Sequence, residues 1–159
     1  MATAYPLPDE LKTKQLLELL FDGLDVKPGG KFDSSPTGGA WFGLFVSDSG
    51  APVALCGADV NLAAIFGAAF SMLPVAAAKD AAKSRDLTPV MIDNVREIMN
   101  ICTRLVMDNA SPHLKLDQVY PRMSLPATAV TLLTAPAGRR EFQLQLPKYG
   151  AGVMSVLTC

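Results

Sequence analysis

The sequence predicts an α+β fold in which long helices pack against a largely antiparallel β-sheet. Helical periodicity dominates the first two-thirds of the chain, whereas strand-like segments dominate the last third. The chain has 159 residues, of which 50% are hydrophobic, and this is enough to build one domain with a sizeable core. We therefore expect a single domain over residues 1–159, with residues 1–8 as a loose N-terminal arm.

The first third of the chain should contain one helix and one β-hairpin. A helix is predicted from Asp9 to Leu20, because acidic residues occupy its first turn. Segment 27–39 is rich in Gly, Pro and Ser and indicates a loop, and a hairpin follows over 41–56. The inward face of the helix would comprise Leu11, Leu16, Leu17 and Leu20.

The middle of the chain is predicted to be helical. Asp59 can cap a helix over 62–72 by accepting a hydrogen bond from an amide of its first turn. Residues 76–86 form either a linker or a short helix. Thr88 and Pro89 then begin a longer helix, as its cap and its first-turn proline.

The last third of the chain should supply most of the strands. Phe142, Leu144 and Leu146 alternate with two glutamines, a pattern typical of a sheet with one covered face. Residues 147–150 would turn the chain into the last strand. The predicted strands are 115–120, 129–133, 141–146 and 152–157.

Composition argues against several classes of function. The formal net charge is −1 and no basic run is present, so we expect no nucleic-acid binding. Three scattered cysteines and one histidine are too few for a zinc cage, so no metal site is predicted. A Cys–His nucleophilic pair would require His113 to reach a cysteine, and no spacing arranges this. Widely separated cysteines favour a reducing, cytoplasmic setting.

One uncharged stretch, residues 62–78, approaches the length of a membrane span. It is rich in alanine and is interrupted by Gly67, Ser71 and Pro74. We therefore predict a buried helix there and no membrane span. The N-terminus has no basic start followed by an apolar run, so a secretory signal is not expected.

A polar stripe gives the sequence its candidate chemistry. Spacings of three and four residues place its members on one face of the helix that starts at Pro89, opposite an apolar face. Within the stripe, Glu97 can bind a cation, and the carboxamide of Asn100 can hold a water molecule by donating and accepting hydrogen bonds. The stripe consists of Asp93, Arg96, Glu97, Asn100 and Arg104.

The same stripe has a simpler interpretation as a solvated helix face. In that case Asp93 would pair with Arg96, and Glu97 with Arg104. Exposed pairs of this kind contribute only about 0.3–0.5 kcal/mol each. Periodicity alone favours this interpretation and selects no reaction.

The spacing Asp93-x3-Glu97-x2-Asn100 resembles the signature helix of the CheC/CheX/FliY chemotaxis phosphatases, in which Asp or Ser precedes a Glu-x-x-Asn pair. The predicted order of elements is similar to that of a CheX-like domain across most of the chain, and the single signature is closer to CheX than to two-site CheC. Two features differ from the family pattern. Larger residues, Ile101 to Arg104, follow the asparagine, and the downstream proline is out of register, at Pro121 or Pro126.

This resemblance implies that the substrate is the aspartyl phosphate of a CheY-like response regulator. Asn100 would orient the attacking water and Glu97 would pair with the regulator's active-site lysine, while Asp93, Arg96 and Arg104 would support or dock. Positioning of this kind suits phosphoryl transfer. The regulator would bring its own Mg²⁺, so we expect this chain to bind no cofactor.

Two alternatives from other classes remain. The chain could be a non-catalytic binding module of the same fold, as in flagellar switch proteins that lack the catalytic pair. It could also be a dimerisation domain whose strands pair edge to edge with a second copy, and the resemblance likewise suggests a homodimer. Retention of both Glu97 and Asn100 favours catalysis.

Overall fold

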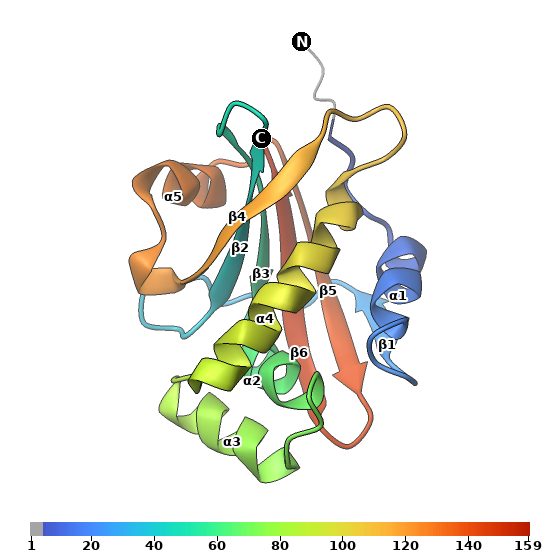
Figure 1. The fold of residues 1–159 in the computed structure, drawn as a ribbon, viewed down its shortest axis with the longest axis vertical. Coiled ribbons are helices and arrows are strands. Elements are labelled where there is room, and N and C mark those ends of the chain that lie inside the picture. Colours follow the sequence, from blue (N-terminus) through green and yellow to red (C-terminus); the bar gives the residue numbers. More distant parts are fainter. Residues whose placement is uncertain (1–4) are drawn as a thin grey trace.

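In the computed structural model, which describes residues 5–159, an antiparallel six-stranded sheet is covered by helices on both faces (Figure 1). The strand order is β1-β5-β6-β3-β2-β4. The strands are β1 (Asp25–Pro28), β2 (Trp41–Ser47), β3 (Pro52–Ala58), β4 (Leu114–Pro121), β5 (Gly138–Leu146) and β6 (Gly150–Thr158). The helices are α1 (Glu10–Glu18), α2 (Val60–Ala69), α3 (Val75–Ser84), α4 (Pro89–Cys102) and α5 (Ala127–Thr134), with 3-10 turns η1 (Thr103–Val106) and η2 (Arg122–Ser124). The expected α+β class is confirmed.

The central strands are buried on both faces. Along β3, Cys56 faces the core shared with α2 and α4, and its neighbour Leu55 faces the core shared with α5. Phe45 and Leu44 divide in the same way on β2. This follows from the two-residue repeat of a strand, which sends successive side chains to opposite faces.

In Figure 1, α4 crosses the front of the sheet diagonally, with α2 beside it and α3 below. The helix α5 packs on the opposite face, over β3 and β6. No other element is drawn over the outward side of α4 in this view. The fold therefore presents one long helix face to the surroundings.

Most of the predicted elements are confirmed, and two of the predicted helix caps form the expected hydrogen bonds. The Asp59 carboxylate accepts a hydrogen bond of 2.8 Å from the amide of Leu62 and begins α2. The Thr88 hydroxyl accepts one of 3.3 Å from the amide of Met91 and begins α4. The hairpin forms as β2 and β3, and segment 76–86 is mostly the helix α3.

Two predicted elements were wrong. Segment 129–133, predicted to be a strand, lies in α5, where Ala129, Leu132 and Leu133 are buried at helical spacing. A short apolar run fits either periodicity, and Pro126, which precedes Ala127 as the N-cap of α5, begins a helix more readily than a strand. The predicted loop at 27–39 starts inside β1, because residues 25–28 pair with β5, a partner distant in the sequence.

The predicted packing at the N-terminus also needs correction. Leu17 is fully buried, but Leu11 is 62% exposed, because α1 covers only the edge of the sheet. Residues 5–8 of the predicted arm are described, and Pro8 is buried with its carbonyl accepting a 2.9 Å hydrogen bond from Arg140. Residues 1–4 of that arm lie outside the described residues.

In the described part of the chain, no helix is long and apolar enough to span a membrane.

Candidate functional site

The inward face of α4 is fully apolar apart from one asparagine. Met91, Val95, Ile98, Met99 and Cys102 are each at most 1% exposed. Burying side chains of this size contributes about 1.5–3 kcal/mol each relative to exposure. This face, which the sequence predicted, holds α4 firmly on the sheet.

Two glycines let α4 approach its neighbours closely. A Cβ atom added at Gly43 of β2 would lie 2.9 Å from the Met99 Cβ, and one added at Gly67 of α2 would lie 2.7 Å from the Met91 Cβ. Both separations are shorter than carbon atoms tolerate, so neither site accepts a larger residue without displacing α4. The helix is therefore set at a fixed height above the sheet.

Asn94 joins α4 to α2 through its side-chain amide. The Nδ2 atom donates to the Gly67 carbonyl at 2.7 Å and to the Ser71 hydroxyl at 2.8 Å, and the residue is only 9% exposed. The sequence analysis did not single out Asn94. Its position at the border between the polar and apolar faces of the helix could have indicated a contact with a neighbouring element. Its two hydrogen bonds oppose rotation of α4 about its own axis.

The C-terminal end of α4 tightens directly after Asn100. The Thr103 hydroxyl donates to the Asn100 carbonyl at 2.8 Å, and the Thr103 amide donates to the same carbonyl and to that of Ile101. The next residues form the 3-10 turn η1, whose Leu105 and Val106 are buried. The backbone of Asn100 is thus held from both sides, by the helix before it and by Thr103 after it.

The predicted polar stripe lies on the outward face of α4 and η1. Asp93, Arg96, Glu97, Asn100 and Arg104 are all exposed. The side chains of Asp93 and Arg96 pair at 2.8 Å, as expected. No ion pair joins Glu97 to Arg104, because Arg104 lies about 10 Å further along the axis.

Glu97 and Asn100 stand one turn apart on this face. Within residues 5–159 the side chains of both residues make no hydrogen bond or ion pair. Their polar atoms are accessible and uncommitted, whereas their backbones are held rigidly. The carboxylate can bind a cationic group of a partner protein, and the carboxamide can bind a water molecule at the interface.

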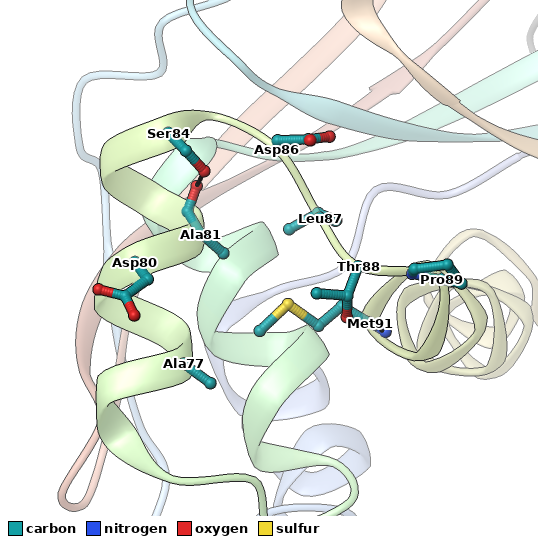
Figure 2. Close-up of a pocket in the computed structure, with 9 residues that line it drawn as sticks. All are labelled: Ala77, Asp80, Ala81, Ser84, Asp86, Leu87, Thr88, Pro89 and Met91. Carbon is teal, nitrogen blue, oxygen red and sulfur yellow. Dashed lines mark hydrogen bonds between the residues drawn. The ribbon is translucent and has the colours of Figure 1, made fainter.

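A cavity of about 600 Å³ lies elsewhere, between α3 and the start of α4 (Figure 2). Ala77 and Ala81 point from α3 toward Leu87 and Met91 in this view. Its polar groups are two aspartates and two hydroxyls, and the hydroxyls of Ser84 and Thr88 already bond to backbone atoms. The cavity does not coincide with the stripe and contains no acid–base pair.

The other residues considered from the sequence are not brought together. His113 is exposed and its Nδ1 lies 2.8 Å from an Asp48 carboxylate oxygen, whereas Cys56 and Cys102 are buried. The Cys102 thiol and burial together raise the pKa of the Cys56 thiol, which makes it a weak nucleophile. Among the described residues, no three His, Cys, Asp or Glu side chains form a group that could hold a metal ion.

Comparison with known proteins gives distant structural similarity. No known protein family matches this sequence, and no curated protein is detectably similar to it. A FliM middle domain from H. pylori aligns with a TM-score of 0.46 at 6% identity, covering 91% of this chain and 81% of that chain. A FliM middle domain (51–229) from Vibrio alginolyticus aligns with a TM-score of 0.42 at 9% identity, covering 94% of this chain and 86% of that chain. At 6% and 9% identity these similarities do not indicate which residues are functional. The candidate site therefore rests on the residues of α4 alone.

Proposed function

We propose that this protein is a cytoplasmic phosphatase that removes the phosphoryl group from the aspartyl phosphate of a CheY-like response regulator. The observation that carries the proposal is the Glu97–Asn100 pair, exposed and uncommitted on a rigid helix. This pair also forms the part of the sequence that resembles the signature of the CheC/CheX/FliY phosphatases.

In the proposed reaction, α4 docks against the phosphorylation pocket of the regulator. The Asn100 carboxamide accepts a hydrogen bond from a water molecule and holds it in line with the phosphorus–oxygen bond to be broken. The water oxygen bonds to phosphorus as the bond from phosphorus to the aspartyl oxygen breaks, the aspartate leaves as a carboxylate, and inorganic phosphate is released with both protons of the water. The Mg²⁺ carried by the regulator would balance the charge on the phosphoryl oxygens.

Glu97 has a different role in this proposal. Its carboxylate would pair with the active-site lysine of the regulator and so set the register of α4 in the pocket. Asp93 would hold Arg96 in place through their 2.8 Å ion pair, and Arg104 would add a docking cation in the turn after Asn100. A positional error of about 1 Å can reduce such catalysis roughly a hundredfold, so a rigid helix is a suitable support.

The test is phosphate release from receiver domains charged with a small phosphodonor. We expect the wild-type protein to accelerate release and Asn100→Ala to abolish the acceleration while leaving the melting temperature unchanged. Asn109→Ala, which changes an exposed asparagine outside the stripe, is the matched control. Equal rates for wild type and Asn100→Ala would disprove the catalytic assignment.

A non-catalytic binding module is the second candidate. Arg96 and Arg104 favour it, because both cations are exposed on the same face and could hold a phosphorylated surface without positioning any water. In that case the receiver domain would bind more tightly when phosphorylated, and its phosphate would be released no faster. Binding and turnover measured on the same samples distinguish the two functions.

We also propose that the protein forms a homodimer through the free edge of β4. In the described sheet this eight-residue strand pairs only with β2, so one row of backbone groups faces outward. Light scattering during size-exclusion chromatography would give about twice the chain mass of 16.9 kDa for a dimer. A mass equal to that of one chain would contradict this proposal.

A further inference from the structure

A groove of about 550 Å³ lies beside the first turns of α4, between Ile92 and the end of β4. Its lining is largely apolar and comes from four separate elements. Trp41 begins β2, Ile92 lies in the first turns of α4, and Pro121 and Met123 lie at the end of β4 and in η2. Met123 is 74% exposed, so an apolar side chain stands open at the end of this groove.

The walls of this groove are held in place by two arginines. Arg85 donates to the Thr37 carbonyl at 2.6 Å, and Arg122 donates to the Ser34 carbonyl at 2.8 Å. Both contacts fasten the loop before β2 to the body of the protein. The groove is therefore preformed, which lowers the entropy cost of filling it.

The charges around the groove largely cancel. Arg85 and Arg122 are matched by Asp86 in the lining and by Asp33, whose pKa is lowered mainly by its hydrogen bonds to Ser35 and also by the charge of Arg85. A strongly charged ligand would therefore gain little there. The chemistry of the lining favours an apolar side chain as the occupant.

The position of the groove relates it to the stripe. Ile92 lies eight residues before Asn100, which is about 12 Å along the helix axis. A stable protein interface covers about 800 Å² on each partner, a patch roughly 30 Å across. A partner that inserts Asn100 into its own pocket can therefore also reach the groove.

The stripe alone is a poor source of binding energy. Exposed ion pairs contribute about 0–1 kcal/mol because water competes for the same charges. Interfaces usually gain most of their affinity from a few apolar anchors seated in desolvated pockets. Ile92 lines the groove, and Arg96 and Asn100 follow it on α4 at spacings of four residues, which places them near the same side of the helix.

We infer that this groove receives an apolar side chain of the same receiver domain that docks on α4, so that it determines which regulator binds. The inference rests on the proposed function for the identity of the partner. Trp41, Ile92 and Met123 supply affinity and selectivity, whereas Asn100 supplies the chemistry.

The test is the affinity of the full chain for a receiver domain held in its phosphorylated form by beryllofluoride and Mg²⁺, measured by calorimetry. Met123→Glu and Met123→Lys should each weaken binding about tenfold or more, because either charge would be buried against an apolar side chain. Met123→Leu should bind like the wild type. The matched control is Met72→Glu, since Met72 is 87% exposed and lies after α2, outside the groove.

Each outcome gives a separate answer. Weaker binding by both charged variants, with Met123→Leu and Met72→Glu unchanged, supports the groove. Unchanged binding by Met123→Glu overturns it, and so does tighter binding by Met123→Lys, which would show an acidic occupant. Failure of all receiver domains to bind the wild type overturns the inference and the proposed function together. Weaker binding by Met123→Glu with phosphate release unaffected by Asn100→Ala would support the groove and overturn only the phosphatase.

Discussion

The side chain of Asn94 on α4 donates a hydrogen bond to the carbonyl of Gly67 on α2 and so joins the two helices. The Asn94 Nδ2 atom lies 2.7 Å from the Gly67 carbonyl oxygen, at a residue without a side chain that could hold the helices apart. The same glycine thus provides both the close approach and the hydrogen-bond acceptor. The orientation of Glu97 and Asn100 depends on this junction, because all three residues lie on α4.

Replacing Asn94 by leucine should lower the free energy of unfolding by about 1–3 kcal/mol. The buried Gly67 carbonyl would lose a donor that water cannot readily replace, whereas the exposed Ser71 hydroxyl can turn to solvent. Urea denaturation followed by circular dichroism measures the change, with Asn61→Leu at an exposed position of α2 as the control. Equal losses in the two variants would show that the Asn94 hydrogen bonds contribute nothing specific.

Gly67→Ala should destabilise the protein by about 1–3 kcal/mol, although alanine is the better helix former. The added Cβ would lie 2.7 Å from the Met91 Cβ and force α4 away from α2. We expect phosphate release to fall as well, since the displacement moves Asn100 relative to the rest of the docking surface. Thermal melting and the release assay on one preparation test both effects, and a higher melting temperature would contradict the close packing described here.

Glu97→Gln should raise KM for the phosphorylated regulator and leave kcat close to the wild-type value. The amide keeps the shape of the side chain and removes the charge that would pair with the regulator's lysine. The expected loss of affinity is about tenfold and should shrink as salt is added. A fall in kcat with KM unchanged would instead place Glu97 among the groups that act on the phosphoryl group.

The phenol of Tyr120 should ionise only above the usual tyrosine pKa of 10.0. Burial raises its pKa, and so do its 2.8 Å hydrogen bond to Asp117 and the charge of that carboxylate. Because the pKa is raised in the folded state, the stabilisation is present below the unfolded-state pKa and is lost as pH rises through the folded-state value. Alkaline titration of phenolate absorbance, compared with Tyr120→Phe, tests this, and Asp117→Asn should lower the pKa. A Tyr120 pKa at or below 10 would contradict it.

Sequence patterns were informative wherever the local signal was long or was bounded by a specific cap. The helix from Thr88 onward was predicted with its cap, its apolar face and its exposed polar stripe, because fourteen residues of helical periodicity leave little ambiguity. The hairpin of β2 and β3 and the last two strands were predicted for a similar reason. Segment 129–133 was too short to distinguish a strand from a helix.

What the amino-acid order determines here is which side chains share a face, since helix and strand periods are local properties of the backbone. Thus the alignment of Glu97 with Asn100 was readable directly. Contacts between distant segments were decided only by tertiary packing: the pairing of β1 with β5, the bond from Asn94 to Gly67, and the groove between Trp41, Ile92 and Met123. These contacts depend on how helices and strands pack against one another. The number of residues between two positions in the sequence does not indicate whether folding brings them together.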